Sequence, residues 1–485
     1  MRPPPKTRAA VWPLLAVLAL FVFGGLSHEG RRQIDRDIAS GDYRVTPVWT
    51  ARALRAYLTN EDDMYRLAAY ADAALGRPYR SFFIRRRVEW DATFARGVQE
   101  DPDAWPVVAP AEPLRPYRDF FVEYPPAAFL AFMPPALLSA TPDGYAFVFK
   151  LEMALCWLFV LVLLRSLGQM SGEPEERAAG WPRALAVAIL SLGMVCTHRY
   201  DAFVAACLTA ALLSAARGGG LRAGLWLGLG AAVKGVPLLV SPVLFAWLWV
   251  ASGRRAAIRF AAATGATVAG LLGLGVLWGG PGVFEAFVYH QARPVQIEST
   301  AGALLGLGSW LRPGLVTVVH SFSSRNLRGD LVPVFAAATS LLALVMVSCA
   351  TVIAIGRLRA TRDPRSQLVV AAEGCLAVLA SYVVLGKVFC PQYVLWLLPF
   401  GLVAARSPGR SPRRLMLGLA ILVATQVIYP IAYGAVKTLA PWAMAIVLAR
   451  NVGILLWSGT LLVRTRHQSV TLGAERVVTD CEPAL

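Results

Sequence analysis

The chain has 485 residues, of which 56% are hydrophobic and only 16% are charged. With a mean hydropathy of +0.54 it is too apolar and too thinly charged for a soluble globular protein, so the composition predicts an integral membrane protein. The formal net charge of +17 lies largely in short loops between apolar segments. That placement indicates membrane topology and contact with anionic lipid, and it argues against nucleic-acid binding.

The seven cysteines include no Cys-x-x-Cys pair, and no histidine lies at zinc-ligand spacing from them. Neither a metal site nor a disulfide framework is therefore predicted. Most of these cysteines are expected to be small apolar residues within helices.

The N-terminus carries Arg2, Lys6 and Arg8 before a short apolar stretch at about residues 11–25. A cleaved signal peptide is one interpretation, but no A-x-A site follows before Arg31, which favours an uncleaved first helix. The three cations then place the N-terminus in the cytoplasm by the positive-inside rule.

Residues 28–142 are predicted to form a long first external loop, because no stretch within them reaches the roughly 20 apolar residues that a span needs. A structureless loop of that length is uncommon in a compact protein. Short helices on the membrane surface are therefore expected at 46–58, 64–75 and 125–138. The Pro-Pro pair that opens the last range marks a helix start.

Eleven further apolar segments follow along the chain, and each is predicted to be a membrane helix. They are residues 143–167, 183–197, 202–216, 222–237, 238–251, 258–278, 331–356, 367–385, 391–405, 415–430 and 441–463. With the first helix they give about twelve transmembrane helices in a single all-α polytopic membrane domain over 1–485. Both termini are then inside, and 464–485 is a cytoplasmic tail.

The loops that this arrangement assigns to the cytoplasm hold clusters of arginine, as the positive-inside rule requires. These are Arg165, Arg177 and Arg183; Arg217 and Arg222; Arg254, Arg255 and Arg259; Arg357, Arg359, Arg362 and Arg365; Arg406, Arg410, Arg413 and Arg414; and Arg464 and Arg466.

The first external loop contains the adjacent carboxylates Asp62 and Asp63, which follow Glu61. A carboxylate near an apolar boundary can have its pKa raised and act as a general base toward a sugar hydroxyl. The same residues also suit the first turn of a helix, where acidic side chains cap the N-terminus and complement its dipole. The residues alone leave both interpretations open.

Charged residues interrupt the apolar segments at two places. His198, Arg199 and Asp201 stand between two segments, where an arginine and an aspartate are either functional or joined in a structural ion pair. Lys234 lies about three residues from the outer end of its predicted helix, beside Gly235, which breaks the helix. Its ammonium either snorkels to the interface or binds an anion such as a phosphate.

Three further motifs are predicted to face the same side of the membrane. Glu123 and Tyr124 lie in EYPP; His290, Arg293, Gln296 and Glu298 lie in HQARPVQIES; and Lys387, Gln392 and Tyr393 lie in GKVFCPQY. Several cations and a carboxylate on one face suit a phosphate-bearing ligand, whereas a proton relay would need acids at mid-membrane. The sequence therefore predicts an anion- and sugar-binding site on the external face.

Taken in order, these motifs resemble those of the C-type glycosyltransferases, and among them most closely those of glycosyltransferase family 87. The resemblance rests on EDDMYR from Glu61, GRPY from Gly76, EYPP from Glu123, RYD from Arg199, KGVP from Lys234, RPVQIES from Arg293 and CPQYVLWLLP from Cys390. The chain departs from the family in a long insert between Tyr79 and Glu123. This insert is expected to cover the acceptor site or change its selectivity.

The resemblance implies inverting transfer of a glycosyl unit, mannose in this family, from a polyprenyl-phosphate donor to a lipid or glycan acceptor at the outer face of the cell membrane. The family's catalytic base maps to Asp62 or Asp63, with Asp62 favoured, and its donor-phosphate cations map to Arg199, Lys234, His290, Arg293 and Lys387. Substrate contacts are expected from Tyr65, Glu123, Tyr124, His198, Asp201, Gln296, Glu298, Gln392 and Tyr393. No metal, no other cofactor and no nucleic acid is expected, and membrane lipids are the remaining partners.

A polytopic secondary transporter or lipid flippase is the alternative from a different class. Such proteins often carry two similar halves and place charges at mid-depth. The sequence shows no internal repeat, and its polar residues gather at one face, which favours the enzyme. Arabinose or another pentose on the same carrier fits the residues as well as mannose does.

Overall fold

The computed structural model describes residues 62–76, 115–118, 121–139, 142–170, 180–322, 324–406 and 412–463. Within these ranges the chain is mainly helical and contains one two-stranded sheet. Six of the described helices are long and apolar enough to cross a membrane, and six shorter apolar helices have 10–17 residues. A helical membrane protein is confirmed at this level. The predicted first helix, the surface helix at 46–58 and the tail lie outside the described residues.

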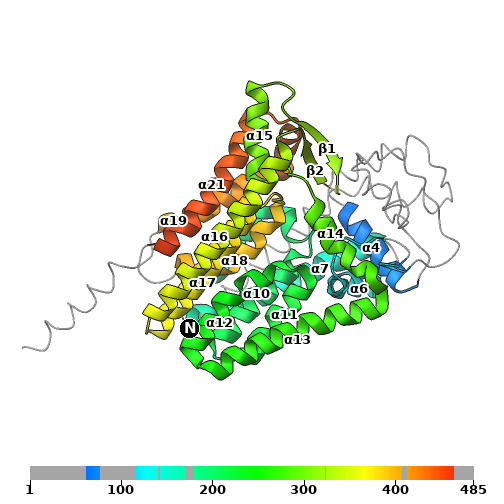
Figure 1. Cartoon of the computed structure of the whole chain (residues 1–485). Helices are drawn as coiled ribbons and strands as arrows, with labels where there is room; N and C mark the ends of the chain where they lie inside the picture. The colour runs from blue at the N-terminus through cyan, green and yellow to red at the C-terminus, as the bar shows by residue number, and fades with distance from the viewer. Residues whose placement is uncertain are drawn as a thin grey trace, which may run out of the picture.

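Near the N-terminus, three helices form a small group at the right of Figure 1. They are α4 (Asp62–Ala74), α6 (Phe129–Leu138), which follows the short 3₁₀ turn η2 (Pro126–Ala128), and α7 (Pro142–Met170). Both α6 and α7 pack against α4 and against each other. The helix start predicted at the Pro-Pro pair is confirmed, because Pro125 caps η2 with an extended backbone and Pro126 is its first residue.

The next part of the chain forms a layer of packed helices. Its elements are α9 (Trp181–Leu192), η3 (Gly193–Cys196), α10 (Asp201–Ala216), α11 (Gly220–Lys234), η4 (Val236–Val240), α12 (Ser241–Ser252) and α13 (Arg254–Gly279). Helix α11 packs between α10 and α13. On α11, Gly220, Gly224 and Gly228 recur every fourth residue and face α13 so closely that a Cβ on Gly228 would lie 2.7 Å from the Cβ of Thr267. Such small residues allow membrane helices to approach each other.

Between residues 280 and 330, which were expected only as an external loop, the chain forms defined elements. These are η5 (Gly280–Phe284), α14 (Glu285–Ala292), α15 (Thr300–Leu311) and a hairpin of β1 (Thr317–Ser321) with β2 (Ser324–Arg328). The strands are antiparallel and pair Val319 with Asn326. Ser299 caps α15, since its Oγ accepts a hydrogen bond of 3.0 Å from the Gly302 amide.

The C-terminal part supplies the remaining long helices. They are α16 (Val332–Ala360), α17 (Pro364–Leu385), η6 (Pro391–Tyr393), α18 (Val394–Arg406), α19 (Pro412–Gln426), the π-helical turn η7 (Val427–Ile431), α20 (Tyr433–Lys437) and α21 (Pro441–Val463). Helices α16 and α21 both pack on α17, and α19 packs on α21 (Figure 1). Each of the eleven segments predicted from residue 143 onward therefore coincides with a helix.

The core is formed by helices that are apolar on all sides, as expected of buried membrane helices. Helices α10 and α17 are buried along nearly their whole length. By contrast, only 22% and 17% of the most apolar windows of α13 and α16 are buried, which leaves residues such as Leu341 and Val352 facing outward. Helices α13 and α16 are therefore the flanks that suit contact with lipid tails.

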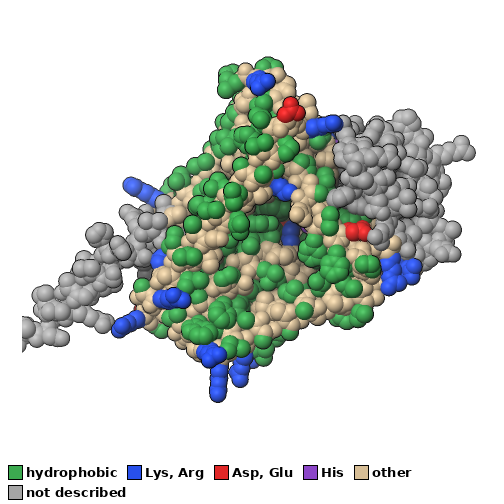
Figure 2. Space-filling view, in the orientation of Figure 1, with side chains coloured by type: hydrophobic (Ala, Val, Ile, Leu, Met, Phe, Trp, Pro, Cys, Tyr) green, Lys and Arg blue, Asp and Glu red, His purple; other side chains and the backbone are tan. Residues whose placement is uncertain are grey.

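Inner and outer helices also differ in length. The 16 residues of α10 and the 15 of α11 correspond to about 22–24 Å, less than the roughly 30 Å of a bilayer's hydrocarbon core. Helix α16 has 29 residues, or about 43 Å. Short inner helices beside longer outer ones leave a recess, and Figure 2 shows a hollow near the middle of one face, lined by hydrophobic side chains with Lys or Arg atoms inside it.

Candidate active site

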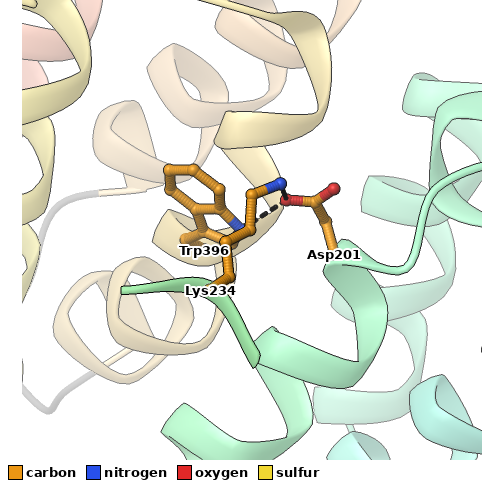
Figure 3. Close-up of polar contacts among 3 residues, drawn as sticks. All are labelled: Asp201, Lys234 and Trp396. Atoms are coloured by element: carbon orange, nitrogen blue, oxygen red, sulfur yellow. Dashed lines mark hydrogen bonds and ion pairs between the residues drawn. The ribbon is translucent and has the colours of Figure 1, made fainter. Parts of the chain in front are cut away.

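Lys234, Asp201 and Trp396 meet at the ends of three helices (Figure 3). Lys234 is the last residue of α11, Asp201 is the first of α10, and Trp396 lies in the first turn of α18. The Lys234 Nζ lies 2.7 Å from the Asp201 Oδ1, and the Trp396 Nε1 donates to the same oxygen at 2.7 Å. The ion pair of Asp201 is thus made with Lys234, across two helices.

Three aromatic rings surround the Lys234 ammonium. Its Nζ lies 4.7 Å from the ring centre of Tyr200, 5.0 Å from that of Trp396 and 5.4 Å from that of Tyr393. Tyr393 and Trp396 stack on each other with ring centres 4.3 Å apart. Such rings attract a cation through their faces. The ammonium is therefore held in place by Asp201 and by these rings.

Lys234 nevertheless keeps binding capacity. An ammonium has three N–H donors, and Asp201 takes one of them. The side chain is 18% exposed, so part of it is accessible to a ligand. An oriented, partly exposed ammonium of this kind suits an anionic oxygen.

The EYPP motif lies beside this group. The Tyr124 ring packs edge-on against the Tyr200 ring, with centres 5.4 Å apart, and against the Tyr70 ring of α4 at 6.5 Å. Glu123 is buried, and its carbonyl oxygen lies 3.0 Å from the His290 Nε2 of α14. EYPP therefore joins α4, α10 and α14.

The predicted acidic motif is at the start of α4. Helix α4 begins at Asp62, which is about 12 Å along the helix from Tyr70. This backbone suits the helix-capping interpretation. The side chains of Asp62, Asp63 and Tyr65 lie outside the described part of the chain, so the general base stays a prediction.

The RPVQIES segment links α14, the hairpin and the loop before α18. An Arg293 N–H donates to the Ser324 Oγ of β2 at 2.9 Å. The backbone amide of Gln296 donates to the Lys387 carbonyl oxygen at 2.9 Å. The Gln296 side-chain Nε2 lies 3.4 Å from the Cys390 Sγ. Two motifs about 90 residues apart in the chain thus bind each other directly.

Glu298 ends this segment in a buried position. It is 2% exposed, and its Oε2 accepts a hydrogen bond of 3.2 Å from the Gln296 side chain. Burial raises the pKa of Glu298 to about 7, although the positive charges of Arg450 and Arg199 act in the opposite direction. This carboxyl group is therefore able to change its charge near neutral pH.

Arg450 and Asn451 of α21 complete the contacts of Glu298 and were missed by the sequence reasoning. The Arg450 side chain donates to the Glu298 carbonyl oxygen at 2.9 Å, and the Asn451 Nδ2 lies 3.4 Å from the same oxygen. The sequence feature that could have identified them is an arginine followed by an asparagine in the middle of an apolar 23-residue helix. Charged residues in such positions often mark functional sites.

The remaining predicted residues lie at the edges of this group. The Lys387 Nζ donates to the Gln291 carbonyl oxygen, and burial together with the charge of Arg293 lowers the pKa of Lys387. His198 is buried, and its Nδ1 lies 2.8 Å from the Met194 carbonyl oxygen. Arg199 is half-buried and acts on Glu298 through its charge, and Gln392 is half-buried in η6.

Together these residues form what we term the charged cluster. It consists of Glu123, Tyr124, Arg199, Tyr200, Asp201, Lys234, His290, Arg293, Gln296, Glu298, Lys387, Tyr393, Trp396 and Arg450. Several of its buried polar atoms lack a hydrogen-bond partner among the described residues. They are the Tyr200 hydroxyl, Asp201 Oδ2, Arg293 Nε, Glu298 Oε1 and one Arg450 N–H group. Buried polar groups are normally satisfied, so this mixture of donors and acceptors fits a polar ligand or ordered water.

Within the described residues, no group of three His, Cys, Asp or Glu side chains is arranged to hold a metal ion.

Comparison with known proteins identifies the family of the chain. No protein with a curated description matches the sequence. The family model of glycosyltransferase family 87 matches residues 121–381, which is more than half of the chain. The match includes EYPP, RYD, KGVP and RPVQIES, and it ends before the CPQY motif and Arg450. On this evidence the protein, a helical membrane protein with a charged cluster at the ends of its inner helices, belongs to glycosyltransferase family 87.

Proposed function

We propose that this glycosyltransferase transfers a glycosyl unit, mannose, from a polyprenyl-phosphate donor to a lipid or glycan acceptor at the outer face of the membrane, with inversion at the anomeric carbon. The observation that carries the proposal is the partly exposed Lys234 ammonium, fixed by Asp201 and three aromatic rings. Arg293 and Lys387 lie in the segments joined by the Gln296 amide, and the charges of Arg293 and Lys234 both act on His290. A phosphate group fits this concentration of cations.

The proposed reaction balances as a single displacement. The acceptor hydroxyl oxygen attacks the anomeric carbon, and its proton passes to the carboxylate of Asp62. The bond from that carbon to the phosphate oxygen breaks on the opposite face, and its electron pair stays on the departing polyprenyl phosphate. Lys234 stabilises the charge that develops there, because fixed donors are most effective where charge appears in the transition state.

A transporter or flippase is not favoured, because the family match identifies a glycosyltransferase. The donor class is tested by incubating purified protein in lipid nanodiscs with a labelled polyprenyl-phosphate sugar and measuring release of polyprenyl phosphate. Wild-type protein that binds the donor but releases no polyprenyl phosphate with any acceptor glycolipid would contradict the proposal.

The residue roles are tested in the same assay. Asp62→Asn is expected to reduce turnover by about 10²- to 10⁴-fold while donor binding persists, since a general base contributes that much. Asp63→Asn distinguishes the two neighbouring acids. Lys234→Met should weaken donor binding, whereas Arg255→Met, an exposed cation at the other helix ends, should not. Full activity of both aspartate variants would exclude this acidic motif as the base.

A further inference from the structure

Arg450 lies inside a membrane helix and is almost fully buried. It follows the first residue of α21 by nine positions, about 13 Å along the axis, and is 2% exposed. An arginine in this position is costly unless it is paired, and it usually faces a functional interior.

Three contacts hold the Arg450 guanidinium in one orientation. Its Nε donates to the Asn451 Oδ1 at 2.9 Å, and one terminal N–H group donates to the Glu298 carbonyl oxygen at 2.9 Å. Its central carbon lies 3.8 Å from the ring centre of Phe389. The other terminal nitrogen has no partner among the described residues. A planar guanidinium has several N–H donors in a fixed arrangement, so it can be held in one orientation by several contacts better than a lysine ammonium can.

The carboxyl group of Glu298 is influenced by two cations from different elements. Arg450 of α21 and Arg199, just before α10, both favour its charged form. On the same segment, the Gln296 side chain donates to one carboxyl oxygen, while the other oxygen has no partner in the part of the chain that the structure describes. Glu298 is therefore a buried acid whose ionisation depends on neighbours outside its own segment.

We propose that Arg450 is a positioning residue of the active site: it binds the Arg293–Ser299 segment through the Glu298 carbonyl oxygen and acts on the Glu298 carboxyl group through its positive charge, and so it orients Arg293 and Gln296 for the donor. This role rests on the proposed function, because it concerns the segment that is to bind the donor. A purely structural tie between α21 and α15 is the competing explanation. Asn451 is the uncharged comparison for such a structural contact, because its Nδ2 lies 3.1 Å from the Thr300 Oγ1 and so also connects α21 to α15.

The test compares Arg450→Met, Arg450→Lys and Asn451→Ala in the full-length protein in detergent or nanodiscs. Each variant is made with Glu298 and with Glu298→Gln, and thermal stability is measured from pH 5 to 9. The difference within each pair isolates the titration of Glu298. Donor consumption is measured on the same samples.

In Arg450→Met the Glu298 titration midpoint should rise by about one pH unit or more, because a neighbouring cation is lost. It should stay near the wild-type value in Arg450→Lys and in Asn451→Ala. Donor consumption should fall about tenfold or more in Arg450→Met, as expected for loss of a charge-assisted hydrogen bond. Arg450→Lys should be intermediate because it keeps the charge but loses the planar fork.

Equal midpoints in Arg450→Met and Asn451→Ala would overturn the proposal and leave Arg450 a structural tie. So would a similar shift in Arg450→Lys and Arg450→Met. If Arg450→Met does not fold, Arg450→Gln replaces it in the same comparison. Wild-type protein that consumes no donor refutes the proposed function, whereas the Glu298 titration still decides the role of Arg450.

Discussion

The two ends of the inner helices carry positive charge in different ways. At one end, which we term the arginine end, the connections α10–α11, α12–α13 and α16–α17 hold exposed side chains; these are Arg217, Arg222, Arg254, Arg255, Arg359 and Arg362. Figure 2 shows several Lys or Arg side chains projecting from its lower left. At the opposite, motif end, Arg293 and Arg450 are 8% and 2% exposed, and Lys234 is paired with Asp201.

The difference follows from hydration. An exposed guanidinium keeps its water, so its exact position matters little and only the number of charges is constrained. A buried cation loses its water and must be compensated by hydrogen bonds, opposite charge or aromatic rings. Cations at the motif end therefore specify the geometry around them, and those at the arginine end do not.

Burial alone does not make a site. At the arginine end, an Arg357 terminal nitrogen lies 2.6 Å from the Glu373 Oε2, and Glu373 is fully buried. This pair joins α16 to α17. The motif end differs from this pair because six chain segments, which hold the residues of the charged cluster, converge there.

The largest expected effect separates the two ends directly. Lys234→Met leaves Asp201 buried without its ion partner, so the free energy of unfolding should fall by about 3–5 kcal/mol. Arg255→Met, an exposed cation, should change it by less than about 0.5 kcal/mol. Unfolding in detergent with increasing denaturant measures both. Equal losses would remove the distinction between the ends.

The next effect is the pH dependence of the free energy of unfolding that Glu298 causes at the motif end. The pKa of Glu298 in the folded protein is about 7, above its ordinary value of 4.5. Ionisation therefore opposes folding, and stability should be lost as the pH rises from about 4.5 to about 7. Glu298→Gln removes this loss, so above pH 7 the variant should gain roughly 3 kcal/mol over the wild type. A constant difference between pH 5 and pH 8 would show that Glu298 does not titrate in this range.

A smaller effect tests the packing that connects the two ends. A Cβ on Gly224 of α11 would lie 2.8 Å from the Cβ of Ala263 on α13, whereas one on Gly265 of α13 would meet nothing within 4 Å. Gly224→Ala should destabilise the protein by about 1–3 kcal/mol. Gly265→Ala should instead stabilise it slightly, by roughly 0.5 kcal/mol. Thermal melts of the two variants measure the contrast, and a destabilising Gly265→Ala would contradict it.

The smallest effect lies at the arginine end. Asp363 caps α17, because its Oδ2 accepts hydrogen bonds from the Ser366 amide at 2.8 Å and the Ser366 hydroxyl at 2.7 Å. These bonds lower the pKa of Asp363 below its ordinary value of 3.8. The cap should therefore stabilise the protein at neutral pH and weaken only in acid. Asp363→Ala should cost about 1 kcal/mol at pH 7. A loss of the same size at pH 3 as at pH 7 would exclude this cap.

Much of the fold follows from local composition. Long apolar runs predict the helices from residue 143 onward, because a membrane segment has to satisfy its backbone hydrogen bonds within itself. The region around Thr317–Arg328 was not predicted as a hairpin, since its strands are short and its apolar residues few. The hairpin also contacts RPVQIES, because Gln296 pairs with Asn326, and no local pattern reveals such a contact.

The sequence by itself determined the membrane class, the helical segments and the polar motifs that interrupt them, because a polar residue in an apolar run is costly and stands out wherever it occurs. The tertiary structure alone decided the partners: that Asp201 binds Lys234 and Trp396, that Gln296 contacts Cys390, and that Arg450 holds the Glu298 carbonyl. These residues lie far apart along the chain. Their contacts depend on how helices of unequal length pack, which local sequence does not encode.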